Sequence, residues 1–181
     1  MGRSVSNFFI SLDGVVEAPD QWHFPYFDEN MAAAVGRGQE STQAFLMGRT
    51  LYDEWSRYWP AQPQDEPFSR FINTVPQYVV SSTLTSAEWQ DTAVVSGDVA
   101  TQLADLRART DGTIGISGSA TLVRWLLAHD LLDALNLLVH PIAVGHGQRL
   151  FEDTPTHRLR LVRQRAFPTG VLDLTYAPAA D

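Results

Sequence analysis

Gly48, Arg49 and Thr50 stand where an apolar run typical of a strand meets an amphipathic run typical of a helix, in the stretch FLMGRTLYDEW. A cation there is unfavourable, because the unpaired N–H groups at a helix N-terminus already carry partial positive charge. In one interpretation, Arg49 pairs with Asp53 or Glu54 in the first turn. In the other, a phosphate is held by backbone N–H groups, the Thr50 hydroxyl and the guanidinium together. These residues alone leave both interpretations open.

Two further stretches, VVSGDV and ISGSAT, also run from a strand through Gly and a small polar residue into a helix. Ligands of open α/β sheets lie outside the carboxyl ends of the strands, so such turns can converge on one crevice. Asp98 in VVSGDV is interpreted as a plain helix cap, since an acidic cap repels phosphate. Ser119 in ISGSAT is open to both readings, helix capping and anion binding, because no acid follows it in the first turn.

The elements that must position these turns alternate along the chain. Short β-rich runs bounded by turn residues predict strands at 5–12, 43–48, 77–82, 92–97 and 113–118. Helical periodicity predicts helices at 25–38, 50–59, 98–110 and 119–130. This alternation predicts a three-layer α/β fold, with a mostly parallel sheet and helices on both of its faces. Pro168, Thr169 and Gly170 separate two later strand-like runs and predict a C-terminal antiparallel hairpin.

The composition narrows the class of protein. The chain has 181 residues, of which 44% are hydrophobic and 19% charged, so one globular domain over 1–181 is expected. No apolar run approaches the ~20 residues of a membrane helix, and the N-terminal stretch lacks a signal-peptide pattern, which favours a soluble cytoplasmic protein. A net charge of −8 argues against nucleic acid as a partner. All 13 basic residues are Arg, so an anion must be held by Arg, hydroxyls or backbone.

Histidine spacing gives little support for a metal site. The five histidines show neither H-x-H nor H-E-x-x-H spacing, and the chain has no Cys. Arginines alternate in pairs along the run 158–167 and change phase between Leu161 and Val162. This pattern is typical of a solvated strand face interrupted by a bulge, with a grip on a phosphorylated substrate as the alternative.

Several motifs in a fixed order resemble the dihydrofolate reductase superfamily. They are FFISLDGVVEAP, FLMGRTLYDEW, YVVSS, ISGSATLVRWLL and LLDALNLLVHPIAVGHGQRLF. The chain is similar in particular to the reductase domain of riboflavin-pathway deaminase-reductases and to their stand-alone relatives. The likeness runs from about Val5 to Tyr176 and implies the dihydrofolate reductase fold.

The resemblance implies an NADPH site. It places Gly48, Arg49 and Thr50 on the pyrophosphate and the 2′-phosphate side of the cofactor, and Ser81 and Ser82 beside the adenosine 2′-phosphate. It also places one glycine-rich turn under the pyrophosphate and nicotinamide, formed by Ser117, Gly118, Ser119, Ala120 and Thr121. Dihydrofolate reductases carry two adjacent glycines joined by a cis peptide in that turn, whereas this chain has Ser117 before Gly118.

Hydride transfer from a nicotinamide also needs a proton source, which the resemblance places near the first helix. Asp28 follows three aromatic residues that would desolvate it and raise its pKa, and Asp13 lies inside the SLDG match. The alternatives are structural: charge complementarity at a helix N-terminus for Asp28, and a turn held by its own side chain for Asp13. Trp22 and Phe27 are the expected substrate contacts. Trp22 lies on the loop that corresponds to the substrate lid, or else in a small cluster packed under that loop.

The sequence therefore predicts an NADPH-dependent reductase of a small flat heterocycle. The substrate would be a pyrimidine or pteridine, and the riboflavin-pathway compound 5-amino-6-(5-phosphoribosylamino)uracil is one such candidate. The alternatives are a non-catalytic nucleotide-binding protein that keeps the fold and a structural dimer module without a ligand. A homodimer is expected, because relatives often pair through their C-terminal strands.

Overall fold

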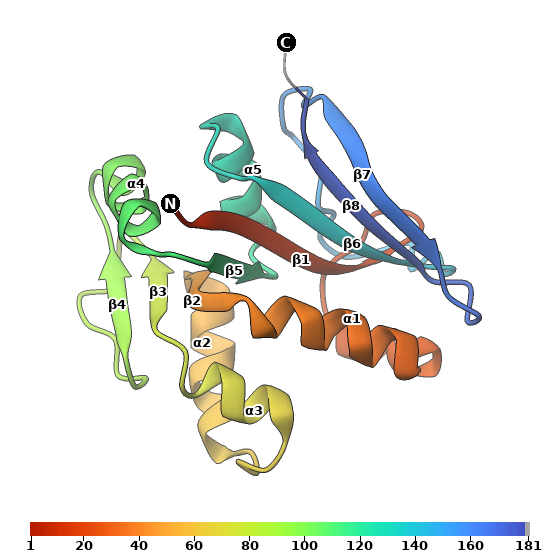
Figure 1. The fold of residues 1–181 in the computed structure, drawn as a ribbon, viewed down its shortest axis with the longest axis horizontal. Coiled ribbons are helices and arrows are strands. Elements are labelled where there is room, and N and C mark those ends of the chain that lie inside the picture. The colour runs from red at the N-terminus through yellow and green to blue at the C-terminus, as the bar shows by residue number, and fades with distance from the viewer. Residues whose placement is uncertain (180–181) are drawn as a thin grey trace.

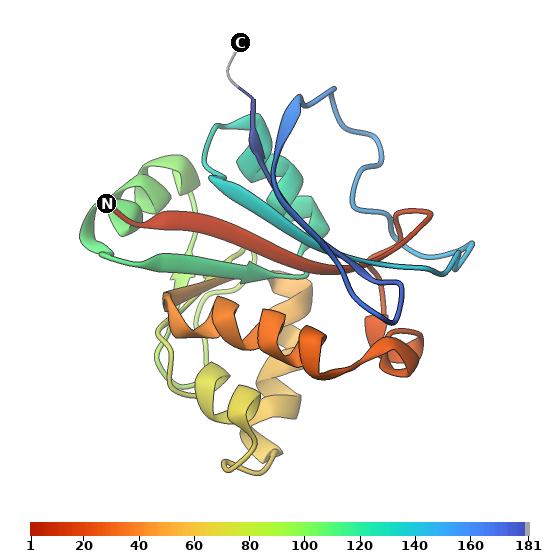
Figure 2. The ribbon, with the colours of Figure 1, turned by 45° about the vertical axis from the view of Figure 1, so that its right-hand side comes forward.

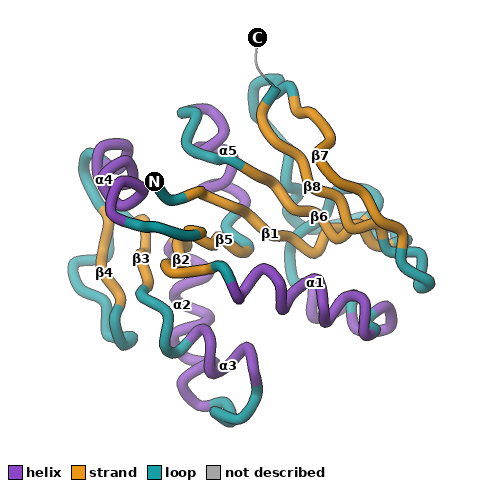
Figure 3. The backbone as a smooth tube through the Cα atoms, viewed as in Figure 1, coloured by secondary structure: helices purple, strands orange, loops and turns teal. Residues whose placement is uncertain are grey.

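A computed structural model describes residues 1–179 of the chain, and residues 180–181, the end of the predicted domain, lie outside the described residues. Eight strands form one sheet in the order β4-β3-β2-β5-β1-β6-β8-β7 (Figures 1 and 3). The strands are β1 (Arg3–Ser11), β2 (Thr42–Gly48), β3 (Gln77–Val80), β4 (Thr92–Val95), β5 (Thr113–Ser117), β6 (Ala134–His140), β7 (Leu159–Ala166) and β8 (Leu172–Pro178). The first six strands of the order pair in parallel, and β8 and β7 add the antiparallel edge. The predicted α/β fold class is confirmed.

Helices cover both faces of the sheet. They are α1 (Glu29–Glu40), α2 (Arg49–Tyr58), α3 (Pro67–Ile72), α4 (Val99–Arg109) and α5 (Ala120–Ala128), with 3₁₀ turns at Pro19–Gln21, Phe24–Tyr26 and Trp59–Ala61. The largest core cluster joins α4 and α5 to one face of the sheet. On the other face, α2 and α3 pack over β2 and β3, and α1 lies along β1 and the C-terminal strands (Figure 2).

The alternating burial of β1 explains how the two faces differ. Its even positions from Ser4 to Ile10 are buried, and Phe8 and Ile10 join the core under α5. Its odd positions face α1, where Phe9 packs with Met31. In the described structure Met31 is the one buried residue of α1, so this helix lies on the sheet without a broad apolar contact.

Two helices differ from the sequence prediction. The first helix begins at Glu29 instead of residue 25, because a 3₁₀ turn containing Pro25 precedes it and Asp28 caps it. The short helix α3 was not predicted. It begins at Pro67, where Glu66 accepts hydrogen bonds from the N–H groups of Phe68 and Ser69.

The C-terminal hairpin forms as predicted. Strand β8 pairs with β6 and with β7, and the β7 register shifts between Leu161 and Arg163, which confirms the expected bulge. No helix among residues 1–179 is both long enough and apolar enough to span a bilayer.

Candidate functional site

Two turns predicted to touch a cofactor are joined directly. Gly48 ends β2 and serves as the N-cap of α2, and its backbone N–H donates to the Ser119 hydroxyl over 2.9 Å. A Cβ on Gly48 would lie 3.3 Å from that oxygen, so glycine allows the close approach. The hydrogen bond fixes the MGRT turn against the ISGSAT turn at the carboxyl edge of the sheet.

Ser119 does not cap its helix in the predicted way. It occupies the N-cap position of α5 in the left-handed region (φ +56°), yet its side chain makes no capping hydrogen bond within the described residues. The hydroxyl contacts Gly48 instead. Gly118 precedes it with φ +55°, and the Ser117–Gly118 peptide is trans, as are all peptide bonds in residues 1–179.

A pocket of about 400 Å³ lies beyond the carboxyl ends of β3 and β4. Its lining consists of Arg49, Val80, Ser81, Ser82, Thr83, Ser96, Gly97 and Val99. Within residues 1–179 this lining contains one cation, hydroxyl groups and no carboxylate. A phosphate group suits such a surface, because guanidinium and hydroxyl donors all present protons to it.

Arg49 forms the ion pair of the first interpretation and also reaches the pocket. Its Nε lies 2.8 Å from each carboxylate oxygen of Asp53, and its Nη1 lies 3.5 Å from the Thr83 hydroxyl. The pairing with Asp53 is therefore confirmed, although α2 begins at Arg49 and Asp53 lies past the first turn. The side chain remains 40% exposed and forms part of the pocket wall.

Of the other predicted cofactor residues, Ser81 and Ser82 line this pocket, whereas Gly48, Thr50 and the turn 117–121 do not. Ser81 accepts hydrogen bonds from the N–H groups of Thr83 and Leu84, so its hydroxyl shapes the turn as well as the pocket lining. Thr50 and Thr121 are exposed at the start of α2 and α5, and Ala120 is buried. The pocket also includes Ser96 and Gly97, which the sequence prediction assigned to a plain cap.

Asp98 shows why that assignment was incomplete. Its carboxylate accepts from the backbone N–H and the hydroxyl of Thr101, which confirms the cap and lowers the pKa of Asp98. Ser96 and Gly97, the two residues before the cap, line the pocket. A cap and a ligand surface thus share one turn.

Asp13 holds two loops together. Its carboxylate accepts from the Ser11 hydroxyl over 2.6 Å and from the N–H groups of Val144 and Gly145 over 3.0 and 2.8 Å. These donors, Ser11 first, lower the pKa of Asp13 to about 2. The carboxylate is therefore ionised at neutral pH and carries no proton to donate.

Asp28 corrects the pKa expected from its aromatic neighbours. Its Oδ1 accepts from the N–H of Met31 over 2.9 Å as the N-cap of α1, and its Oδ2 accepts from the Asn30 side chain. These bonds, the Met31 bond first, lower the pKa of Asp28. The prediction of a raised pKa was wrong because the helix begins after Asp28 and supplies backbone donors to it. The alternative at the helix N-terminus is confirmed.

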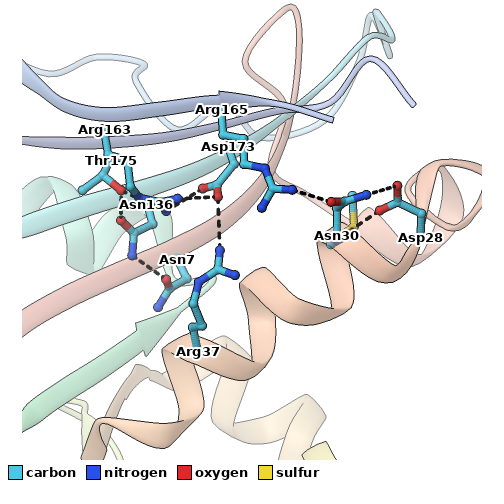
Figure 4. A network of polar contacts seen from close by, with 10 residues as sticks. Asn7, Asp28, Asn30, Arg37, Asn136, Arg163, Arg165, Asp173 and Thr175 are labelled. Atoms are coloured by element: carbon cyan, nitrogen blue, oxygen red, sulfur yellow. Dashed lines mark hydrogen bonds and ion pairs between the residues drawn. The ribbon is translucent and has the colours of Figure 1, made fainter. Parts of the chain in front are cut away.

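A polar network bridges α1 to the C-terminal strands (Figure 4). The buried carboxylate of Asp173 receives two hydrogen bonds from Arg163, at 2.8 and 2.9 Å, and Arg37 of α1 lies 3.5 Å away. Arg165 donates to Asn30 at the other end of α1 over 2.7 Å. Two arginines of the β7 run are therefore engaged by polar partners, which qualifies the prediction of a solvated face.

The same face of the sheet carries adjoining amides. Asn136 of β6 donates to Asn7 of β1 over 2.9 Å and accepts from the Thr175 hydroxyl over 2.8 Å (Figure 4). Asn7 also pairs in register with Ser117, the residue that opens the glycine-rich turn. The surface under α1 therefore begins one strand away from the proposed nicotinamide turn.

The segment 19–27 packs onto the ends of β1 and β6. Trp22 is buried, its Nε1 donates to the Glu17 carbonyl, and its ring meets that of His140 at 5.2 Å. The alternative of a small cluster under the loop is thus confirmed for Trp22. Phe27 is 47% exposed and touches His23 edge-on.

Sequence reasoning missed His23 and His140. Both are buried among aromatic rings, and burial lowers the pKa of each, with His140 adding to the effect on His23 and Asp20 opposing it. The histidine spacing was weighed for metal binding, and neither His23 nor His140 was among the predicted site residues. The position of His23 was readable in part, since it follows Trp22 on the lid loop.

The strand order, the C-terminal antiparallel edge and the joined turns define a protein of the dihydrofolate reductase-like fold. Residues 4–172 match the RibD C-terminal domain family. The chain belongs to this family.

The chain is also similar to three individual proteins. The uncharacterised protein YyaP of Bacillus subtilis (strain 168) is 24% identical over 179 residues, which cover 96% of this chain and 94% of YyaP. The crystal structure of a protein assigned to riboflavin biosynthesis from Shewanella sp. PV-4 is 20% identical, with a TM-score of 0.81, and the match covers 98% of this chain and 99% of that one. Enterococcus faecalis dihydrofolate reductase, complexed with NADP(H) and RAB-propyl, is 15% identical, with a TM-score of 0.66 and coverage of 99% and 98%.

Proposed function

We propose that the protein is an NADPH-dependent reductase that transfers a hydride to a small flat heterocycle of the pyrimidine or pteridine type. The observation that carries this proposal is the pocket at the β3 and β4 ends, where Arg49 and four hydroxyl residues meet. Family membership supports it, as does the shared fold with a dihydrofolate reductase that binds NADP(H).

The residues present fit such a cofactor. In this proposal Arg49, Ser81 and Ser82 hold the adenosine 2′-phosphate, because they line the pocket and no carboxylate of the described residues does. Gly48 and the turn 117–121 hold the pyrophosphate. The Gly48–Ser119 hydrogen bond keeps the two turns at a fixed separation. When bound, the reduced nicotinamide supplies the hydride.

The proton that completes the reduction needs a separate route. Asp13 and Asp28 have lowered pKa values because they accept hydrogen bonds from the chain, so neither delivers a proton directly. Each remains a proposed catalytic residue through a water molecule aligned by its carboxylate. Trp22 and Phe27 border the proposed substrate side, Trp22 as part of its packed wall and Phe27 as an exposed ring.

The test of this function is the thermal midpoint with NADPH or NADH, for the wild type and Arg49→Ala. Ligand at ~100 times its dissociation constant should add ~2.7 kcal/mol. We expect NADPH to stabilise the wild type more than NADH does, and Arg49→Ala to abolish the difference. Arg57→Ala on the same helix, outside the pocket lining, is the matched control. If no nicotinamide shifts the wild-type midpoint, the reductase proposal fails.

A non-catalytic nucleotide-binding protein is the second candidate. The observation that favours it is that both candidate carboxylates serve structural hydrogen bonds. Steady NADPH oxidation with a panel of pyrimidines and pteridines would separate the two functions. Turnover that Asp13→Asn or Asp28→Asn reduces, with NADPH binding retained, supports the reductase, whereas NADPH binding without turnover supports the second candidate.

We also propose that the chain forms a homodimer through β7. Leu161 and Val162 are about half exposed on this edge strand, and Leu172 of β8 is exposed beside it. A second copy would cover these apolar side chains. Light scattering at several concentrations should give twice the monomer mass, and Val162→Glu should lower it. A concentration-independent monomer mass would contradict the proposal.

A further inference from the structure

His23 occupies a slot between two aromatic rings. Its imidazole stacks on Phe9 of β1 with the ring centroids 4.5 Å apart and the planes at 12°, and Phe24 lies on it at 4.2 Å. His23 is 6% exposed, and its Nδ1 is buried without a hydrogen-bond partner among residues 1–179. A flat ring bearing nitrogen atoms is therefore held between two aromatic faces by stacking, with one polar atom unsatisfied.

His140 presents a hydrogen-bond acceptor to the same cluster. Its Nδ1 lies 2.8 Å from the Leu138 carbonyl, which can only accept, so Nδ1 carries the proton and Nε2 has a free lone pair. His140 is fully buried, and Nε2 lacks a partner in the described part of the chain. Phe9, Trp22, His23 and Tyr26 all meet its ring edge-on at 5.2–6.1 Å.

An unpaired buried acceptor destabilises the folded protein, so a ligand that satisfies it gains affinity. The position of Phe9 and His140 in the sheet also suits a reductase. Phe9 and His140 lie on the α1 face of β1 and β6, and β1 is the neighbour of β5, which ends in the glycine-rich turn. A ring lying on Phe9 would be one strand away from the proposed nicotinamide turn.

We propose that the slot on Phe9 is the binding site for the ring of the substrate. In this proposal His23 fills the slot in the free protein, and a flat heterocycle takes its place. His140 Nε2 accepts a hydrogen bond from an N–H of that heterocycle. The inference rests on the proposed function and narrows the substrate class to heterocycles that carry a ring N–H beside a stackable face.

The experiment measures the dissociation constants of two fluorescent pteridines. Lumazine carries ring N–H groups, and 1,3-dimethyllumazine has the same bicycle without those at N1 and N3. We expect the wild type to prefer lumazine by about tenfold, the value of one hydrogen bond. His140→Phe should remove this preference, and His140→Gln, which retains an acceptor, should restore part of it. A preference that persists in His140→Phe reflects the bulk of the methyl groups and overturns the assignment of Nε2.

His23→Ala tests the slot itself. Removing the imidazole should lower the dissociation constants of both pteridines by up to about tenfold, because the ligand no longer has to displace an aromatic stack. His129→Ala, which removes an exposed histidine stacked on Trp125, should leave both constants unchanged. Unchanged or weaker binding in His23→Ala overturns the proposal that His23 fills the ring site, and so does the absence of pteridine binding to that variant.

The NADPH midpoint shift, measured on every variant, separates this inference from the proposed function. It also shows that each variant is folded. If NADPH still stabilises variants that bind pteridine no differently from the wild type, the ring site is wrong and the reductase proposal stands. If NADPH fails to stabilise the wild type, the proposed function itself fails.

Discussion

The two halves of the carboxyl edge of the sheet are built differently. At β2, β3 and β4 the turns carry hydroxyls, glycines and one arginine around an open pocket. At β1 and β6 the edge is packed shut, because Trp22, His23 and Tyr26 of one segment cover His140. In the proposals above, one half would therefore meet a ligand with preformed donors, whereas the other would first have to move its own side chains.

The largest expected effect concerns two ion pairs, one under α1 and one in the pocket half of the edge. Asp173, under α1, is 4% exposed and bound by two arginines, whereas the Asp53 and Arg49 side chains in the pocket half are 37% and 40% exposed. Asp173→Asn should lower the free energy of unfolding by about 2 kcal/mol, because two guanidinium groups lose their charged partner. Asp53→Asn, the matched control, should cost less than about 1 kcal/mol. Equal losses in urea unfolding would show that burial does not distinguish the two pairs.

Lowering the pH should first reduce the stability that the packed half of the edge, at β1 and β6, contributes. Burial lowers the pKa values of His23 and His140 from their ordinary value, so the unfolded chain binds protons that the folded chain does not. Their contribution is fully present above about pH 6.5 and is lost as the pH falls below it. The lowered carboxylates Asp13, Asp28 and Asp98 lose theirs only below about pH 4.

Urea unfolding at pH 7.5 and 5.5 therefore isolates the histidines. The wild type should lose about 1 kcal/mol over this interval. His140→Phe should lose less, because one of the two buried histidines is gone. A pH dependence in His140→Phe as steep as in the wild type would mean that another group titrates in this range.

The smallest expected effect of a substitution concerns the pocket half of the edge, at β2, β3 and β4. Ser119→Ala leaves the Gly48 N–H without its acceptor and should cost about 1 kcal/mol in urea unfolding. NADPH affinity should fall about fivefold, since the two turns are then no longer fixed together. Ser86→Ala, at an exposed position, is the control. An unchanged NADPH affinity would show that the two turns stay in place without this bond.

The sequence predicted the strands other than β6, and most helices, because their signals are local. Alternating burial in β1 and apolar runs bounded by glycine depend on a few neighbouring residues. The bulge in β7 was also readable, since the arginines change phase at Val162. The helix α3 was missed because six residues after a proline-rich loop carry too little periodicity.

Side-chain partners could be predicted less well, because they depend on segments far apart in the chain. The Ser119 hydroxyl meets Gly48, 71 positions away, so local rules offered only helix capping and anion binding as its roles. The pKa of Asp28 followed from where α1 begins, which the sequence placed several residues too early. The rings around His140 come from β1 and the segment 19–27, and spacing within one run could not reveal them.

Helix α1 has a consequence for the motions of the molecule. It buries Met31 alone in the described structure and is otherwise held by Arg37 and Asn30 through polar bridges to β8 and β7. With so little apolar contact, its backbone amides should exchange hydrogen with solvent faster than those of β1 or β5, by local opening that leaves the sheet intact. In the proposed ring site, the wall formed by α1 would then be compliant and the floor formed by the sheet rigid, so that rings of different thickness would fit without disturbing the core.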